Sequence, residues 1–243
     1  LKDRRPLIYY GWIVLALAFV TMIVAYSVRY AFSVVYVAIL DEYGWSRAAT
    51  AAAFSLNMLL YGVCAPIVGA LVDRYGIRKV VPLAAVFLGL IAAANSRIGT
   101  IWQLYLFFGM TAIGTCAMGY VAQVAMAPNW FIRRRGLAMG IISGGFGAAM
   151  AAIPPLTAYL TDIIGWRQTF LVFGIVSLAI IAPLVALFQR QRPSDKGLLP
   201  DGPRAPSGET ARQPSYDPQS LVVDHKWVGT EWSLRNGIRS YRF

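Results

Sequence analysis

The stretch PIVGALVDRYGIRK, Pro66 to Lys79, brings four charged side chains together in a chain that otherwise avoids charge. Long apolar runs precede and follow it. A second stretch, PLTAYLTDIIGWR from Pro155 to Arg167, repeats the pattern P-x-x-x-x-L-x-D-x-x-G-x-R at the same offsets. A short charged turn between apolar runs, present twice, indicates polar connections between membrane-spanning segments.

The composition excludes an ordinary soluble domain. Hydrophobic residues make up 58% of the chain and charged residues 14%, whereas about 25% of residues are charged in an average soluble domain. The 22 Lys and Arg outnumber the 11 Asp and Glu, but they lie between apolar runs, which favours a lipid bilayer over nucleic acid as the partner. Cys64 and Cys116 lie within apolar runs and His225 is the one histidine, so we expect no metal site and no cofactor.

Six stretches are apolar enough to cross about 30 Å of hydrocarbon, which takes about 20 residues as a helix. Backbone groups in lipid must be paired within the segment, and these runs lack the alternation of a barrel strand. The predicted fold class is therefore an all-α membrane protein with six transmembrane helices. The expected spans are Tyr10–Leu40, Ala48–Val72, Val80–Asn95, Thr100–Ala127, Gly136–Leu160 and Gln168–Phe188.

Basic residues are unevenly divided between the two sides of these spans. One side carries nine of them: Lys2, Arg4, Arg5, Arg74, Arg78, Lys79, Arg133, Arg134 and Arg135. The other side carries three: Arg47, Arg97 and Arg167. Since Lys and Arg are retained on the cytoplasmic side, we expect a multi-pass protein of the cell membrane with both termini cytoplasmic.

The two copies of the charged pattern are separated by three spans, so they must face opposite sides of the membrane. Inverted repeats of three helices are typical of secondary transporters. A chance match between common residues is the alternative. The repeat predicts that Asp73 and Asp162 coincide when the first three helices are superposed on the last three.

The turn GALVDRYGIRK, Gly69 to Lys79, resembles the loop motif G-x-L-x-D-R-x-G-x-R-K of the major facilitator superfamily. In that family, six spans form one half of a twelve-span carrier and the substrate is held between the halves. The resemblance covers Tyr10–Phe188 and implies one half of this fold, with a 3+3 inverted repeat.

Three further stretches are similar to the branch that contains monocarboxylate and oxalate/formate carriers. They are YSVRYAFSVVY from Tyr26 to Tyr36, YGWSRA from Tyr43 to Ala48, and NWFIRRRGLAMGIISGGFG from Asn129 to Gly147. The resemblance implies alternating-access transport of small organic anions, either mono- or dicarboxylates. Symport with a proton and antiport against a second anion are both open.

The motif turn supplies a candidate conformational latch. Gly69 is expected to allow close helix contact and Gly76 a left-handed turn. Asp73 is placed to pair with a basic residue or with a helix N-terminus, and breaking that contact would separate two conformations. The alternative is that these residues only set topology. The candidate latch residues are Gly69, Asp73, Arg74, Gly76, Arg78 and Lys79.

Arg29 lies inside the first span, where a charged side chain costs about 2.5–3.5 kcal/mol on insertion scales. Tyr26, Ser33 and Tyr36 share its helix face by their spacing. A guanidinium offers two parallel hydrogen bonds to a carboxylate, so this face is a candidate anion site. A snorkelling or helix-pairing arginine is the alternative.

Polar side chains on two further spans are candidates for the same cavity. Asn57 and Tyr61 lie on the second span, and Tyr120 and Gln123 on the fourth, each pair at helical spacing. Hydrogen bonding between helices explains them equally well. The two repeat aspartates lie at span ends, so no mid-span carboxylate is expected to relay protons.

We expect residues 1–190 to form the six-helix bundle and residues 191–243 a polar cytoplasmic linker. Because the chain begins without Met, and Glu231 to Phe243 resembles the lead-in to a seventh span, we expect a fragment that lacks a C-terminal six-helix half. A half-size carrier that dimerises is the rival interpretation.

Two other function classes compete with transport. A receptor or sensor that keeps a transporter fold is not distinguishable by sequence. A six-span membrane enzyme would need a nucleophile with its base, or a metal cluster, at membrane depth. The one histidine lies outside the spans, so we expect a protein that is not an enzyme.

Overall fold

The structure is a computed structural model that describes residues 9–190 and 193. Six helical spans are long and apolar enough to cross a membrane, which confirms the predicted number. No strand occurs in the described residues. The helices are α1 (Tyr10–Tyr43), α2 (Arg47–Tyr75), α3 (Ile77–Asn95), α4 (Ile101–Met118), α5 (Tyr120–Trp130), α6 (Arg135–Ile164), α7 (Trp166–Ile175), the π-helix η1 (Val176–Ile181) and α8 (Ala182–Phe188).

Several sequence predictions lie outside the described residues. They concern the basic residues before the first span, the linker after residue 193, and the proposed lead-in to a seventh span.

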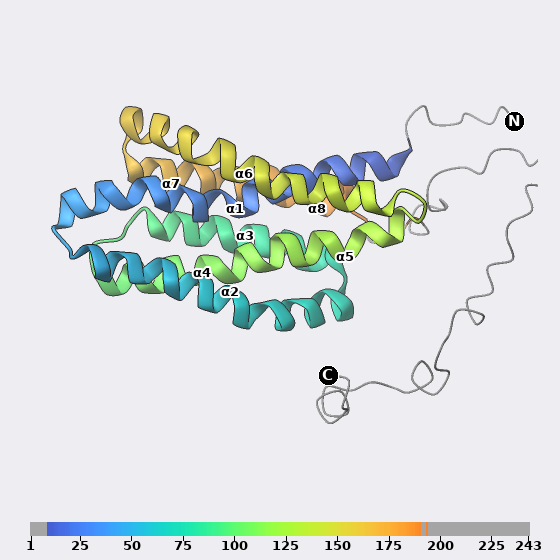
Figure 1. The fold of residues 1–243 in the computed structure, drawn as a ribbon, viewed down its shortest axis with the longest axis horizontal. Helices are drawn as coiled ribbons and strands as arrows, with labels where there is room; N and C mark the ends of the chain where they lie inside the picture. Colours follow the sequence, from blue (N-terminus) through green and yellow to red (C-terminus); the bar gives the residue numbers. More distant parts are fainter. Residues whose placement is uncertain (1–8, 191–192, 194–243) are drawn as a thin grey trace, which may run out of the picture. The chain divides into compact units, whose positions relative to one another are not determined.

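The spans run up and down along one bundle (Figure 1). One end, called here the α2–α3 end, also carries the start of α1, the α5–α6 junction and the end of α8. The opposite end carries the α1–α2, α3–α4 and α6–α7 junctions. The charged turn and its copy therefore lie at opposite ends of the bundle.

The repeated pattern produces the same local backbone at both ends. Gly76 has φ 79° and ψ 153°, and Gly165 has φ 81° and ψ 157°. Each glycine N–H donates to the carbonyl four residues earlier, Val72 or Thr161. Positive φ with extended ψ is essentially restricted to glycine. The expected left-handed turn at Gly76 is thus corrected to an extended, positive-φ junction.

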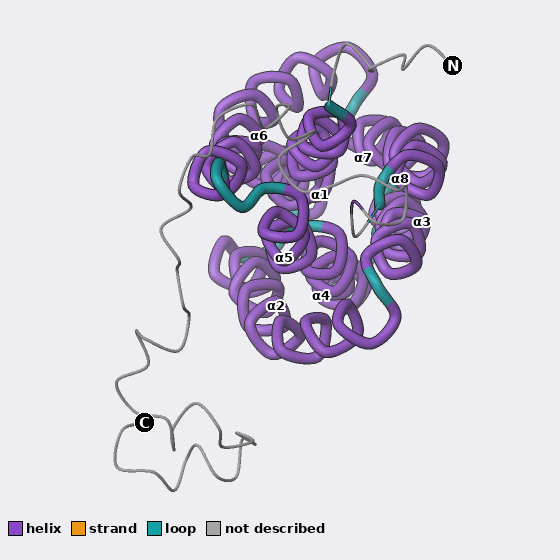
Figure 2. Tube along the Cα trace, turned by 90° about the vertical axis from the view of Figure 1, so that its right-hand side faces the viewer, coloured by secondary structure: helices purple, strands orange, loops and turns teal. Residues whose placement is uncertain are grey.

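The helix pairing also follows the repeat. The most extensive contacts are those of α1 with α6 and of α2 with α4, while α3 packs against α7, η1 and α8 (Figure 2). In such a repeat, α1 corresponds to α4 and α2 corresponds to α6. The contact of α1 with α6 therefore corresponds to the contact of α4 with α2. Such a correspondence is what an inverted three-helix repeat requires.

Several glycines allow close helix contacts, but Gly69, where one was expected, does not. A Cβ on Gly145 of α6 would lie 2.9 Å from the Phe19 carbonyl oxygen of α1. Gly89 of α3 and Gly174 of α7 face each other, since a Cβ on either would lie 2.8 Å from the other's carbonyl oxygen. A Cβ on Gly69, in contrast, would meet no heavy atom of the described residues within 4 Å, so the expected close helix contact does not occur within this part of the chain.

The two prolines of α6 do not end that helix, which continues from Pro154 and Pro155 to Ile164.

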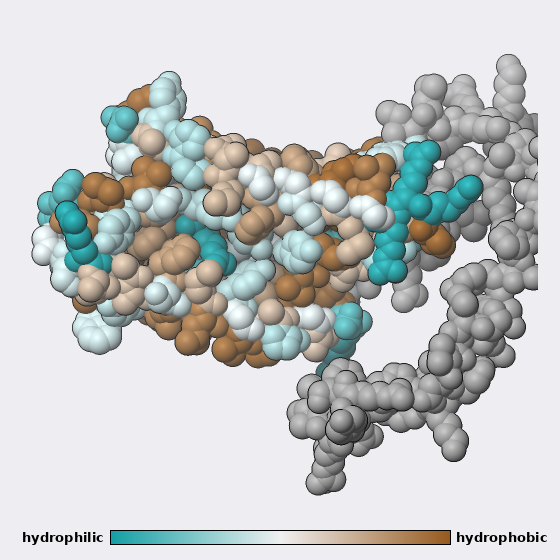
Figure 3. Space-filling view, in the orientation of Figure 1, coloured by the Kyte–Doolittle hydropathy of each residue, from teal (hydrophilic) through white to brown (hydrophobic). Residues whose placement is uncertain are grey.

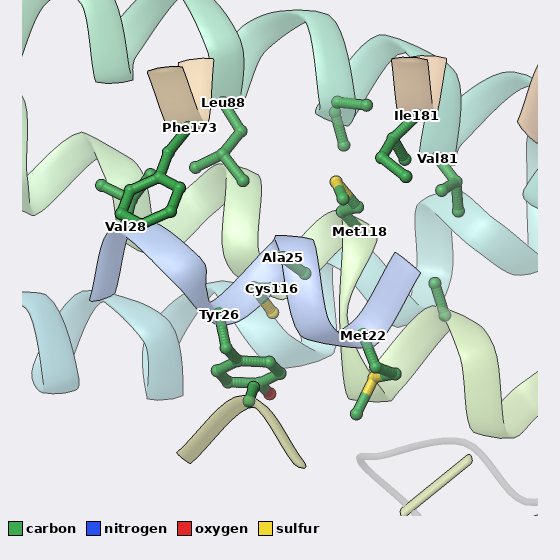
Figure 4. Packing of buried hydrophobic residues seen from close by; sticks show 14 of the residues in the cluster. Met22, Ala25, Tyr26, Val28, Val81, Leu88, Cys116, Met118, Phe173 and Ile181 are labelled. Atoms are coloured by element: carbon green, nitrogen blue, oxygen red, sulfur yellow. The ribbon is translucent and has the colours of Figure 1, made fainter. Parts of the chain in front are cut away.

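The core lies around α1 and the fourth span. In each of them, 61% of the most apolar 18-residue stretch is buried, against 17% for α2. Figure 4 shows Met22 and Tyr26 on one side of α1 and Val28 on the other. The two most buried spans therefore form the centre of the bundle.

We predict that Gly145→Ala destabilises the bundle by about 1–3 kcal/mol, because the added methyl overpacks the α1–α6 contact. Gly147→Ala is the matched control on the same helix, since a Cβ there meets no heavy atom within 4 Å. That control should be neutral, or stabilising by up to about 1 kcal/mol. Unfolding of the purified protein in mixed micelles measures both, and equal effects would contradict the packing argument.

Candidate functional site

A cavity of about 580 Å³ opens on one flank of the bundle. Four helices line it, namely α1, α2, α5 and α6. The described residues that line it are mostly aromatic and include one charged side chain, that of Arg29. The lining residues are Tyr26, Arg29, Tyr30, Phe54, Met58, Tyr61, Gly62, Tyr120, Ser143 and Phe146.

Arg29 is held among rings and a thioether rather than by an acid. Its side chain is 8% exposed, and its guanidinium carbon lies 5.1 Å from the ring centre of Tyr61 and 5.7 Å from that of Phe54. Its Nη2 donates toward Met58 Sδ. Among the described residues no carboxylate forms an ion pair with it. Figure 3 shows a hydrophilic patch between α1 and α2, far from both ends of the bundle.

The aromatic side chains shape the rest of the cavity. The hydroxyls of Tyr26 and Tyr61 are hydrogen-bonded at 2.9 Å, which joins α1 to α2. Phe146 of α6 packs edge-on against the rings of Tyr26 and Tyr30, at 4.9 and 5.9 Å between centres. The cavity thus combines one cation, the hydroxyls of four tyrosines and one serine, and apolar ring surfaces, which suits an anion with an apolar body.

A break in the fourth span places Tyr120 in this cavity. The break lies at Gly119, where a Cβ would lie 2.5 Å from the Thr115 carbonyl oxygen and 3.1 Å from the Tyr26 ring. Gln123 Nε2 donates to the Met118 carbonyl beside the break, at 3.1 Å. An irregular backbone at membrane depth needs such partners.

Four of the eight predicted residues therefore line one cavity: Tyr26, Arg29, Tyr61 and Tyr120. Ser33 and Tyr36 lie further along α1 and do not line it. Ser33 Oγ donates to the Tyr30 carbonyl of its own helix. Tyr36 OH donates to the Arg47 carbonyl, at the start of α2.

Asn57 and Gln123 are buried between helices instead. Asn57 Nδ2 donates to the Phe108 carbonyl and to Thr111 Oγ1 of α4, at 2.7 and 2.8 Å. Gln123 Oε1 accepts from Gln189 Nε2 at 2.5 Å. These contacts match the alternative interpretation, in which both residues pair helices.

Six lining residues were missed by the sequence interpretation, and most of them are not polar. Phe54, Met58 and Tyr61 are separated by four and three residues, so they share one face of α2. This spacing could have identified Phe54 and Met58 from the sequence. Ser143 and Phe146 are likewise three residues apart on α6. Tyr30 and Gly62 carry no comparable signal.

The candidate latch residues lie at the α2–α3 end. Asp73 lines a separate pocket of about 240 Å³ with Ala122 and Met126 of α5. The Arg74 guanidinium carbon lies 5.4 Å from the ring centre of Tyr75. Asp73 forms no ion pair with any other described residue. The latch role therefore stays a prediction.

The one ion pair whose partners are both described lies at the opposite end. Arg167 Nη1 donates to Glu42 Oε2 at 2.8 Å, and Arg167 Nη2 to the Tyr43 hydroxyl at 2.6 Å. Trp166 Nε1 donates to the same Glu42 oxygen. This cluster ties α1 to α7. It was not predicted, because Glu42 was placed beyond the first span.

Residues 9–190 and 193 contain no cluster of three or more His, Cys, Asp or Glu that is arranged to hold a metal ion.

Known proteins resemble this chain over most of its length. The sequence profile described as Major Facilitator Superfamily matches residues 17–234. Monocarboxylate transporter 4 of Rattus norvegicus is 32% identical over 208 residues, which cover 82% of this chain and 42% of that protein. Monocarboxylate transporter 11 of Mus musculus is 30% identical over 199 residues, covering 81% and 43%.

A solved structure has the same fold. It is the crystal structure of a bacterial homolog of the human lysosomal transporter Spinster, inward-facing and unoccupied, with a TM-score of 0.67 at 18% identity. The match covers 83% of this chain and 46% of that one. It confirms the predicted fold class of six helices that form one half of such a fold. The chain spans about two fifths of the length of the curated relatives it matches.

Proposed function

The chain belongs to the Major Facilitator Superfamily, a family of transporters rather than enzymes, and on that premise we propose that it forms the anion-binding side of a carrier for small organic anions. The carrier works by alternating access. The observation that carries this proposal is the mid-membrane guanidinium of Arg29, which lines a cavity without an acidic partner among the described residues.

The chemistry of the cavity supports a carboxylate as cargo. An ionised group that is buried without a counter-ion is costly, and an entering carboxylate removes part of that cost through charge-assisted hydrogen bonds. The Tyr61 ring lies 5.1 Å from the guanidinium carbon. Because the Tyr61 and Tyr26 hydroxyls bond to each other, one O–H of the pair remains to donate to the anion. The rings of Phe54 and Phe146 suit the apolar part of the anion. The relatives' printed names, which specify monocarboxylates, agree with this class.

We further propose that a second six-helix unit closes the open side of the cavity. Met58, Tyr120 and Phe146 line the cavity and are 51%, 42% and 39% exposed. A second copy of this chain, or another segment of a longer protein, can supply that unit. The alternative of a transporter-fold receptor shares the same binding cavity and differs in lacking transport.

Arg29→Lys should weaken carboxylate binding at least about tenfold, because a point charge replaces a planar fork. Arg29→Ala should abolish it. Benzoate-dependent thermal stabilisation of the purified chain measures this, with benzamide as the neutral isostere. Arg97→Ala, which removes an exposed arginine outside the cavity, is the matched control and should bind benzoate normally. Normal benzoate binding by Arg29→Ala would refute the proposal.

Benzoate uptake into proteoliposomes separates a carrier from a receptor, which would bind but not transport. Because the second unit is needed for uptake, the chain is reconstituted at densities that allow dimers to form, and cross-linking is recorded in parallel. Uptake that disappears with Arg29→Ala is the result expected of a carrier. Benzoate binding without uptake by a cross-linked dimer would exclude a carrier made of two copies of this chain, and would leave a receptor or a carrier whose second unit is another segment of a longer protein.

We propose that the α2–α3 end faces the cytoplasm, since the basic residues gather there. Arg78→Cys in a background without Cys64 and Cys116 should then react with a membrane-impermeant maleimide only after the membrane is opened. Trp102→Cys, near the start of α4 at the other end, is the control that should react in intact cells. The reverse pattern would invert the topology.

A further inference from the structure

A second concave surface lies on the bundle, between α2, α3 and α4, and it shares no residue with the Arg29 cavity. Its volume is about 430 Å³. We call it the α2–α4 groove. Its lining includes Leu71 and Tyr75 of α2, Lys79, Leu83 and Phe87 of α3, and Ile113, Gly114 and Ala117 of α4.

The walls of the groove are apolar and face outward. Leu83, Tyr75 and Leu71 are 70%, 51% and 41% exposed. Its floor lies where Gly114 lets α4 approach α3, since a Cβ there would lie 3.0 Å from Leu88 Cβ. On membrane-spanning helices, an outward apolar groove of this kind is filled by acyl chains.

One end of the groove is cationic. Lys79 is the one charged residue among the described residues that line it. The Arg74 guanidinium stacks 5.4 Å from the ring centre of Tyr75, which forms part of the same wall. Asp73, the acid of the same turn, lines the other pocket with α5 instead. The groove therefore has a basic end, and the neighbouring carboxylate is directed elsewhere.

We propose that the α2–α4 groove binds one acidic phospholipid. An acyl chain lies along Leu71, Leu83 and Phe87, and the phosphate meets Lys79 with Arg74 nearby. Acyl chains alone give little selectivity, because lipid tails are as apolar as leucine. The charge of the headgroup provides the selectivity. Acidic lipids are enriched in the cytoplasmic leaflet, and the α2–α3 end faces that leaflet in the proposed orientation. The bound lipid thus touches the turn that carries the candidate latch.

Native mass spectrometry of the purified chain, equilibrated with equimolar phosphatidylglycerol and phosphatidylcholine, tests this inference without reference to cargo. The wild type should retain phosphatidylglycerol in preference. Lys79→Gln should lower that preference about fivefold, the effect of one basic residue at an acidic membrane surface. Lys79→Arg should keep it.

Arg135→Gln is the matched control, because Arg135 is the first residue of α6 and lies outside the groove. The α5–α6 junction is at the same end of the bundle as the α2–α3 turn (Figure 1). This variant should leave the preference unchanged. Ala117→Phe fills the groove from α4 and should reduce retention of both lipids; circular dichroism and gel filtration verify that each variant is folded.

Two results would overturn the inference. Equal losses for Lys79→Gln and Arg135→Gln would mean a general surface attraction. Full displacement of phosphatidylglycerol by inorganic phosphate would mean an ion site that has no need of the acyl chain.

Discussion

A guanidinium on a membrane-spanning helix has to be kept out of the hydrocarbon, and the arrangement around Arg29 follows from that constraint. Its helix, α1, is among the two most buried spans. Rings of α2 surround the cation, and the Met58 sulfur accepts from it. Rings and a thioether are weak partners for a full charge. The cavity is therefore electrostatically incomplete, and an anionic cargo is the ligand that would complete it.

Close helix packing makes such a cavity possible. Helices in lipid gain little hydrophobic energy from one another, so small residues at their contacts matter most. Gly145 brings α6 onto α1, and the Gly89–Gly174 crossing brings α7 onto α3. Gly119 then interrupts the fourth span, and Gln123 supplies a donor to the carbonyl beside the break. One consequence is the position of Tyr120 in the cavity wall.

The spans were predictable because hydrocarbon thickness and backbone pairing leave few alternatives to an apolar helix. The paired turns at Gly76 and Gly165 were predictable in position, since the sequence pattern repeats, but not in backbone conformation. Four of the ten residues that line the cavity were predicted. Tyr36 shares a face with Arg29, yet seven residues advance about 10 Å along a helix, which takes it beyond the cavity.

Other parts required the tertiary structure. A polar residue inside a span can face a cavity or another helix, and Asn57 turned out to reach α4. Phe54, Met58 and Phe146 line the cavity but look like ordinary apolar residues in the sequence. The Glu42–Arg167 ion pair joins residues that are 125 positions apart, and no local sequence pattern predicts it.

The central claim is that the Arg29 guanidinium contacts the carboxylate of the cargo. Solid-state NMR can measure this contact directly, through dipolar coupling between ¹⁵N-labelled arginine side chains and ¹³C-carboxyl benzoate bound to the protein in bilayers. A carbon–nitrogen distance of about 4 Å, typical of a bidentate pair, should appear in the wild type and disappear in Arg29→Lys. Bound benzoate that shows no such coupling, or the same coupling in both proteins, would contradict the account.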